Sequence, residues 1–371
     1  MNIILIIIAI YIILEINIFL FLKKYNSIKW LIFNKNIKFD IKKFNYFKKN
    51  IYNEKLGWDY KFIKGKQNFI SKKGFRKSIY SNRNNNILAF GDSYTFCRQV
   101  ENSKTWEELI SKKKRIFVSN FGVGNYGLDQ AYLKFKTINK KRENKIVIFG
   151  FVPETICRIQ SSWKNYTEFG NIHGFKPSVE LKNGNINFRK NFLKKKHNFS
   201  NLKTVIKNIN KYDRFYKEKF LKYNFSFPYV LSFAKNFIFN FQIFKKVLVS
   251  KKNQVLLEEE IFPIIMKNNI KLSHSLYNEN YSKKLMQTLI SHISNDLKKQ
   301  KLIFYFVVFP QLFDLKLDTR NNYQNFFRNI KNKNIIDLTT LFLKSKNFKN
   351  LYTNDKYGGH LSNKGNDLVA K

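Results

Sequence analysis

Cysteine is scarce in this chain, and its scarcity excludes two kinds of architecture. Cys97 and Cys157 are the only two cysteines among 371 residues, so neither a disulfide framework nor a cysteine zinc cluster can be built. We therefore expect no metal site. Both cysteines follow predicted strands, and they could either form one disulfide or remain as inert buried thiols.

Acidic residues are also few. The chain has 25 Asp and Glu against 69 Lys and Arg, a formal net charge of +44. Such a charge is often the footprint of nucleic-acid binding. Here Lys, Asn, Ile and Phe are enriched together along the whole length, as an AT-rich genome would produce, and the basic residues form no single stripe. We expect a solvated basic surface and no nucleic-acid partner, while attraction to anionic lipid or acidic polysaccharide stays compatible.

The N-terminus lacks a basic first segment and a small-residue cleavage site, the two marks of a cleaved signal peptide. Residues 3–22 form an apolar run long enough to cross a bilayer, interrupted by Glu15 and Asn17. We interpret residues 1–24 as a single transmembrane anchor, with a signal peptide as the alternative. Two lysines after the run favour a cytoplasmic body, but the family resemblance described below favours a periplasmic one.

The remaining residues divide into a lead-in and one domain. Residues 25–85 have no long hydrophobic period, and we expect them to pack on the edge of a domain at residues 86–371. Short apolar runs in this domain alternate with segments that have the hydrophobic period of a helix. This alternation predicts a parallel sheet covered on both faces. The predicted strands are Ile87–Phe90, Arg115–Asn120, Ile146–Phe151, Leu302–Phe309 and Asn334–Leu338.

A long interval separates the third and fourth predicted strands. It is too long for one crossover, so we expect a helical insertion at about residues 180–300. Residues 280–299 are predicted to be an amphipathic helix that returns the chain to the sheet. Residues 227–244 are rich in aromatic side chains. We interpret them as a helical cap that buries these side chains, and contact with a membrane surface is the alternative.

The strongest chemical signal is a serine at the end of a strand. Residues 87–90 run directly into Gly91-Asp92-Ser93, and a strand-to-helix turn exposes a nucleophile there. A serine hydroxyl needs a base, a group that orients the base, and donors for the oxyanion. His360, which follows two glycines, is the candidate base, and Asp355 is the candidate orienting acid. The backbone N–H of Ser93 is a candidate oxyanion donor.

Each candidate also has a purely structural interpretation. Ser93 beside Asp92 could simply cap a helix. His360 could be a loop histidine with its hydrogen bonds satisfied, and Asp355 could form a turn. The other histidines lie in basic or predicted helical segments and lack the spacing of metal ligands. We expect them to be surface or packing residues: His173, His197, His274 and His292.

Four ordered blocks from about residue 87 to the end resemble those of the SGNH/GDSL hydrolase family. They are Gly91 to Ser93, Asn120 to Gly127, Gly150 to Glu154, and Asp355 to His360. The resemblance implies a flavodoxin-like three-layer α/β/α fold, ester hydrolysis or acyl transfer through an acyl-serine, and no cofactor. Bacterial members with a membrane anchor often act on acetyl groups of cell-surface polysaccharide, which is why we expect a periplasmic domain.

Two blocks depart from the family pattern near the oxyanion. Asn125 stands where a glycine N–H usually completes the oxyanion hole; because the donor is backbone and Asn tolerates left-handed conformations, Asn125 can serve, with Gly124 beside it. Glu154 stands where the family has an asparagine amide. Since an ionised carboxylate repels an oxyanion, Glu154 must be protonated, be turned away and replaced by a donor such as Arg158, or take part in substrate choice.

The acid is displaced as well. The family usually places it three residues before the histidine, where this chain has Tyr357. Asp355 therefore reaches His360 only if the intervening turn is compact.

A competing interpretation uses the same residues. Residues 122–127 fit the Gly-x-Gly-x-x-Gly dinucleotide fingerprint, and Glu154 beyond the next strand could bind a ribose. That fingerprint usually follows the first strand of its sheet, and the acidic residue that binds the ribose usually lies closer to the glycines than Glu154 does here. It also leaves the Gly-Asp-Ser and Gly-Gly-His motifs unexplained, so we favour the hydrolase interpretation.

The sequence thus predicts a membrane-anchored esterase or O-acyltransferase that forms an acyl-Ser93 intermediate. Its expected partners are an acylated cell-envelope polysaccharide, or another ester substrate, and the membrane through residues 3–22. The alternative is a catalytically weak or inactive relative that binds glycan or assembles with envelope enzymes. Glu154 is the best support for that alternative.

Overall fold

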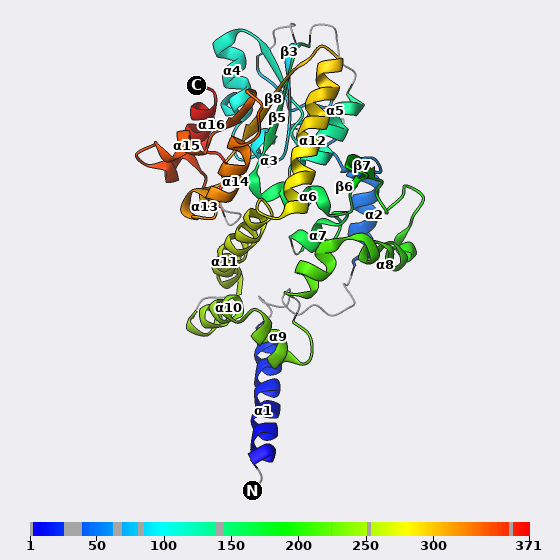
Figure 1. Cartoon of the computed structure of the whole chain (residues 1–371), viewed down its shortest axis with the longest axis vertical. Coiled ribbons are helices and arrows are strands. Elements are labelled where there is room, and N and C mark those ends of the chain that lie inside the picture. Colours follow the sequence, from blue (N-terminus) through cyan, green and yellow to red (C-terminus); the bar gives the residue numbers. More distant parts are fainter. Residues whose placement is uncertain are drawn as a thin grey trace.

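A five-stranded parallel sheet forms the centre of the domain in the computed structural model, and the expected α/β fold is confirmed (Figure 1). The strand order is β4-β3-β5-β8-β9, the flavodoxin-like order. The strands are β3 (Asn85–Phe90), β4 (Phe117–Asn120), β5 (Ile146–Phe151), β8 (Ile303–Val308) and β9 (Ile335–Asp337). The structure describes residues 3–25, 39–61, 69–80, 85–138, 144–168, 170–223, 225–250, 254–355 and 359–371.

Alternation along β3 divides the core between the two faces of the sheet. Leu88 and Phe90 belong to one hydrophobic cluster, whereas Ile87 and Ala89 belong to another on the opposite face. The first cluster includes α5 (Leu128–Thr137), α12 (Asn280–Lys299) and α14 (Arg320–Arg328). The second includes α4 (Trp106–Lys114), α15 (Thr339–Leu343) and α16 (Asn363–Val369).

Local sequence explains the helices that flank the sheet. In α12 the buried Leu285, Leu289 and Ile293 recur every four residues and form one apolar stripe, and the bounds of α12 are those predicted. The segment between β3 and β4 is divided into two helices, α3 (Ser93–Phe96) and α4. The division follows from Cys97, which ends α3 in the left-handed conformation with φ of 54°.

The described parts of the lead-in contain a helix that the sequence did not predict. α2 (Ile41–Asn50) begins after Asp40, whose side chain accepts from the N–H of Lys43. Its buried Phe44 and Phe47 pack in a cluster with Trp163 of the domain. Two short strands follow, β1 (Tyr52–Asn53) and β2 (Gly57–Trp58).

The insertion between β5 and β8 is not wholly helical, contrary to expectation. It contains an antiparallel hairpin of β6 (Ser178–Lys182) and β7 (Asn185–Arg189). Asn183 and Gly184 join the strands with φ of 51° and 75°, as a two-residue turn of this sequence favours. The remaining elements include α6 (Ile156–Gln160), α7 (Lys164–Thr167), α8 (Leu202–Tyr212), α9 (Tyr229–Lys235), α10 (Phe237–Val249) and α11 (Gln254–Ser275).

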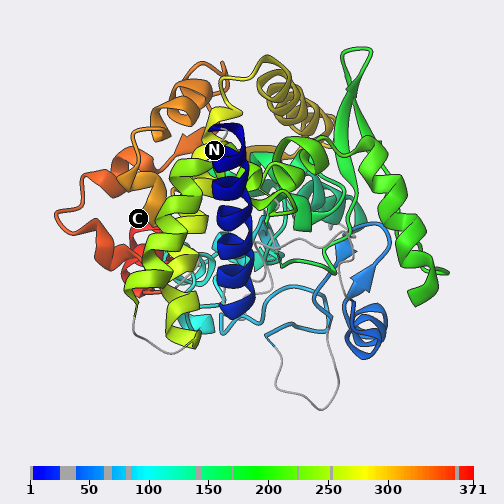
Figure 2. The same cartoon turned by 90° about the horizontal axis from the view of Figure 1, so that it is seen from below.

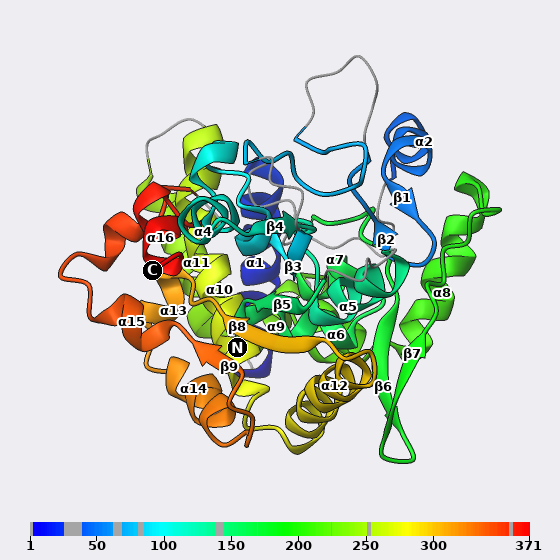
Figure 3. The ribbon, with the colours of Figure 1, turned by 90° about the horizontal axis from the view of Figure 1, so that it is seen from above.

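One described helix near the N-terminus, α1 (Ile3–Lys24), is long and apolar enough to span a membrane, with a mean hydropathy of 2.9. Its C-terminal part packs on the insertion, where Leu22 joins a cluster with Ile243 and Val247. Seen from below, α1 lies beside the segment of residues 229–249 (Figure 2). Seen from above, helices cover both faces of the sheet (Figure 3).

Candidate active site

A cavity of about 430 Å³ lies at the carboxyl edge of the sheet, where the ends of the parallel strands meet. Four of its lining residues follow successive strands of the sheet: Ser93 after β3, Asn125 after β4, Glu154 after β5 and Gln311 after β8. His360, near the C-terminus, also lines this cavity. The topology therefore brings together residues that are far apart in the chain.

Ser93, His360 and Asp355 form a continuous hydrogen-bonded chain. The Nε2 atom of His360 lies 3.0 Å from Ser93 Oγ, and Nδ1 lies 2.9 Å from Asp355 Oδ2. The side chains of His360 and Asp355 are 14% and 23% exposed. An imidazole that donates from Nδ1 to a carboxylate keeps Nε2 available to accept a hydroxyl proton. This geometry can activate Ser93 as a nucleophile.

The displaced acid reaches the imidazole because the backbone wraps around its carboxylate. The N–H groups of Gly359 and His360 donate to Asp355 at 3.2 and 3.1 Å, and the Thr353 hydroxyl donates at 2.9 Å. Gly359 has a φ of 81°, which favours glycine. No motif in the sequence marked Thr353. Tyr357 lies outside the described residues.

Asp92, not Ser93, caps the short helix that follows β3. The Asp92 carboxylate accepts from the N–H of Tyr94 at 2.9 Å. The Ser93 hydroxyl is therefore left to contact His360, which argues against the purely structural interpretation of this serine.

Gly91 allows α3 to approach the sheet closely. A Cβ atom at this position would lie 2.1 Å from Thr95 Oγ1 and 2.6 Å from the carbonyl oxygen of Gly150. A larger residue would displace α3, and with it Ser93. Each residue of the Gly-Asp-Ser motif thus has a separate structural role.

Tyr94 supports the histidine from the nucleophile's own helix. Its hydroxyl donates to the carbonyl oxygen of Gly359 at 2.6 Å, and its ring lies 5.4 Å from the His360 ring. The side chain is buried. Nothing in the sequence pattern marked Tyr94 beyond its place next to Ser93.

Two backbone N–H groups along the cavity are available to a ligand. Within the described ranges, the N–H groups of Ser93 and Asn125 donate to no protein acceptor. Asn125 has the left-handed conformation expected of it, with φ of 70°. Gly124 does not fit the role considered for it, because its N–H donates to Tyr60 Oη at 3.2 Å.

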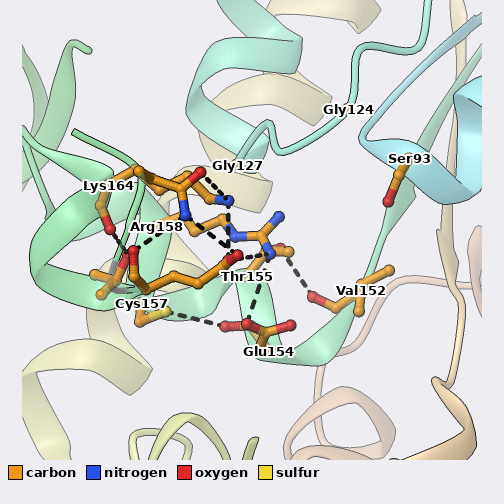
Figure 4. Close-up of polar contacts among 12 residues, drawn as sticks. Ser93, Gly124, Gly127, Val152, Glu154, Thr155, Cys157, Arg158 and Lys164 are labelled. Atoms are coloured by element: carbon orange, nitrogen blue, oxygen red, sulfur yellow. Dashed lines mark hydrogen bonds and ion pairs between the residues drawn. The ribbon is translucent and has the colours of Figure 1, made fainter. Parts of the chain in front are cut away.

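Glu154 is buried and held by two neighbours. Its Oε2 atom accepts from Gln311 Nε2 at 2.8 Å, and Oε1 lies 3.6 Å from Nη2 of Arg158. Burial acts to lower the pKa of Arg158, but Glu154 and Glu168 together raise it above its usual value. Figure 4 shows Arg158 and Glu154 side by side, with Ser93 apart from both. Glu154 is thus an ion-pair partner of Arg158. No motif in the sequence marked Gln311 as part of the site.

Three carboxyl groups line the cavity beside two guanidinium groups and the imidazole of His360, although the chain as a whole is strongly basic. The carboxyl groups are those of Asp92, Glu154 and Glu168, and the guanidinium groups are those of Arg98 and Arg158. Burial acts to raise the pKa of Glu168, but Lys164 and Arg158 lower it to about 2, so Glu168 is ionised at neutral pH.

The glycines of the dinucleotide fingerprint serve packing. A Cβ atom on Gly122 would lie 2.5 Å from the backbone nitrogen of Phe96, so α3 fills the space beside this glycine. The N–H of Gly124 already donates to Tyr60. The acid of this interpretation, Glu154, is bound by Gln311 and Arg158. The geometry therefore gives no support to dinucleotide binding.

Both cysteines are free and buried, so the disulfide alternative is excluded. Burial raises the pKa of the thiols of Cys97 and Cys157. Among the described residues no group of His, Cys, Asp and Glu side chains could hold a metal ion. Of the other histidines, His274 is fully buried and pairs with Asp314 at 3.0 Å.

Comparisons with known proteins leave the family unassigned. No family model matches this chain, and no curated protein matches it. A solved structure provisionally described as a lipolytic protein of the G-D-S-L family, from Desulfitobacterium hafniense DCB-2, is similar at 12% identity and a TM-score of 0.35. The match covers 77% of this chain and 96% of that one. Values this low assign neither a family nor an activity.

Proposed function

We propose that this protein is an ester hydrolase or O-acyltransferase that works through an acyl-Ser93 intermediate. The observation that supports it is the hydrogen-bonded chain from Ser93 through His360 to Asp355. A base held in one tautomer beside a hydroxyl is what nucleophilic acyl transfer requires.

The reaction divides into two halves. First, His360 Nε2 takes the Ser93 proton while Oγ attacks the ester carbonyl carbon, and the N–H groups of Ser93 and Asn125 donate hydrogen bonds to the oxyanion. The C–O bond then breaks, and the leaving alcohol receives the proton from His360. In the second half, water or a sugar hydroxyl loses a proton to His360 and attacks the acyl carbon. Ser93 regains the proton as the acid or new ester is released.

We propose acyl esters of cell-envelope polysaccharide, acetyl esters above all, as the substrate. Support comes from the chemistry of the cavity, because the carboxylates of Glu154 and Glu168 can accept from sugar hydroxyls. The same carboxylates repel the phosphates of a polyanion such as nucleic acid. An apolar α1 is compatible with an enzyme held at the membrane.

The proposal is tested by labelling the full chain, in detergent, with a fluorophosphonate, which reacts only with an activated serine. We expect labelling of the unsubstituted protein and hydrolysis of an aryl acetate, with both lost in Ser93→Ala. The control is Ser275→Ala, which removes an exposed hydroxyl and is expected to leave both unchanged. Equal labelling of Ser93→Ala and the unsubstituted chain would exclude the mechanism.

A second candidate function is a catalytically inactive protein that binds glycan or assembles with envelope enzymes. The observation that favours it is the Glu154 carboxylate in the cavity wall, close to where negative charge would develop. A folded, unsubstituted chain that fails to react with the fluorophosphonate but binds acetylated glycan would support this function instead.

We further propose that the domain is periplasmic. Alkaline phosphatase fused after Lys371 tests the orientation, since it becomes active only after export. Activity of the fusion would support the proposal, and an inactive but expressed fusion would place the domain in the cytoplasm.

A further inference from the structure

A hydrophobic cluster separate from those of the sheet joins the N-terminal helix to the insertion. Leu22 of α1 packs with Phe239 and Ile243 of α10 and with Ile261 of α11. Phe21 stacks on Phe244 at a centroid distance of 4.4 Å. The apolar N-terminal helix therefore packs directly against α10.

A buried carboxylate ties α9 to the same apolar helix. Glu15 accepts from the backbone N–H groups of Tyr229 and Val230 at 2.6 and 3.0 Å. These two groups begin α9 and have no partner within their own helix. A carboxylate in the middle of an apolar segment is costly unless it is bonded. Glu15, which interrupts the apolar run in the sequence, thus fixes α9 beside that run.

The outer side of α9 and α10 remains apolar and uncovered. Seven large side chains there are each at least 50% exposed. We call this set the α9–α10 surface: Phe227, Leu231, Phe237, Ile238, Phe241, Leu248 and Val249. The expectation that residues 227–244 bury their aromatic side chains is met only in part, because Phe239 is buried whereas Phe227, Phe237 and Phe241 are exposed.

Lysines surround a hollow beside this surface. The hollow has a volume of about 880 Å³, and its lining combines apolar side chains of the α9–α10 surface with five lysines: Lys235, Lys245, Lys246, Lys267 and Lys271. Lys246 pairs with Glu260 at 3.1 Å. In the described ranges the other four form no ion pair. An apolar surface bordered by lysine is typical of elements that lie in the interface of an anionic bilayer.

We propose that the α9–α10 surface lies in the interface of the bilayer that α1 enters, with the five lysines at anionic phospholipid headgroups. Two observations select a bilayer as the occupant. The surface is continuous with a helix apolar enough to span a membrane, and the adjoining charge is complementary to anionic lipid.

The proposal has a consequence for the cavity at Ser93. Phe262 and Met266 of α11 line that cavity, while Ile264 and Lys267 of the same helix line the lysine hollow. At 1.5 Å per residue, Phe262 and Met266 lie about 12–18 Å along α11 from its first residue. A bilayer contact at α10 would hold the cavity at a set height above the membrane.

The test places an environment-sensitive fluorophore on the full chain, reconstituted in vesicles whose lipids carry a quencher on the acyl chains. Ile238→Cys labels the α9–α10 surface at a side chain that is 74% exposed, and Leu248→Cys labels its other end. The matched control is Ile79→Cys, at an isoleucine that is 61% exposed. Its neighbours Ser78 and Tyr80 donate to Glu108 of α4, which lies far from α9 and α10 (Figure 1). The unsubstituted chain is the blank, because its two cysteines are buried.

We expect quenching at positions 238 and 248 and none at position 79 in vesicles containing phosphatidylglycerol. In vesicles of phosphatidylcholine alone, we expect the affinity of the α9–α10 surface for the bilayer to be lower by about fivefold for each lysine that would contact an anionic headgroup. Quenching at position 238 no greater than at position 79, or unaffected by removal of the anionic lipid, would overturn the proposal. The first of these results is the one expected if another protein covered the surface. Neither result depends on the proposed activity of Ser93.

Discussion

One carboxylate oxygen of Asp355 contacts two atoms of His360, the histidine five positions further along the chain. This Oδ2 atom accepts from the backbone N–H of His360 at 3.1 Å and lies 2.9 Å from the Nδ1 atom of the same residue. The acid therefore fixes both the backbone and the ring of His360, so the displaced acid position is compatible with a working dyad.

Replacement of this acid tests its orienting role. In Asp355→Asn the amide can stabilise the wrong imidazole tautomer, and we expect kcat for aryl acetate hydrolysis to fall by about 10³–10⁴-fold. Asp318→Asn is the control, because it makes the same chemical change at a fully exposed side chain. Equal rates for Asp355→Asn and the unsubstituted chain would show that the carboxylate does not act through His360.

Arg158 is expected to be essential for stability. It lies 3.6 Å from Glu154 and 3.5 Å from Glu168, and all three side chains are nearly buried. Arg158→Met would leave both carboxylates without this charge, which we expect to lower the free energy of unfolding by about 3–5 kcal/mol.

Denaturant unfolding of the detergent-solubilised chain measures this loss. Arg189→Met breaks a more exposed pair with Glu180, whose side chain is 30% exposed, and we expect it to cost no more than about 1 kcal/mol. Similar losses for the two arginine variants would contradict the assignment of a buried charge cluster.

Asp92 should make the stability depend on pH. Burial raises its pKa from 3.8 to about 6, while Arg158 acts in the opposite direction. Between these values the folded chain holds a proton that the unfolded chain has released. The contribution is therefore complete below about pH 4 and is lost as the pH rises through 6, with a total on the order of 3 kcal/mol.

Asp92→Asn removes this titration while keeping an oxygen that can accept from Tyr94. The free energy of unfolding, measured from acid to neutral pH, should fall less steeply in the variant than in the unsubstituted chain. Burial also raises the pKa of Asp213 to about 6, so the difference between the two curves, not either slope, is the quantity to compare. A difference that does not change with pH would contradict the prediction.

Gly91→Ala should harm both stability and reactivity. The added methyl group would lie 2.1 Å from Thr95 Oγ1, and we expect a cost of about 1–3 kcal/mol together with slower fluorophosphonate labelling, because α3 carries Ser93. Gly74→Ala is the control. It places a methyl group in open space at a φ of 83°, so it should cost stability without changing the labelling rate.

Patterns within a few residues predicted much of the fold. The five strands and α12 were recognised because burial imposes a period on neighbouring residues. The hairpin of β6 and β7 was missed although Asn183-Gly184 is its local signal. The helix α2 was missed because its exposed side is rich in Lys and Asn, and only packing against Trp163 and its neighbours explains the burial of Phe44 and Phe47.

The candidate site was predicted where motifs carry it and missed where contacts do. Ser93, His360 and Asp355 lie in short motifs of distinctive residues, so the sequence could propose them. Tyr94, Thr353 and Gln311 have no such mark. Their importance lies in a hydroxyl or amide directed at a particular partner, and that direction depends on segments from elsewhere in the chain.

By itself, the sequence determined the five strands of the sheet, the helix α12, the apolar N-terminal helix and the end of a strand as the place of the serine, because these follow from local periodicity and turn chemistry. Only the tertiary structure decided that His360 contacts a serine 267 positions away, that Glu154 pairs with Arg158, and that the α9–α10 surface adjoins α1. Such contacts require the parallel strands to end at one edge and the insertion to fold back on α1. These arrangements depend on packing between distant segments and not on any single stretch of residues.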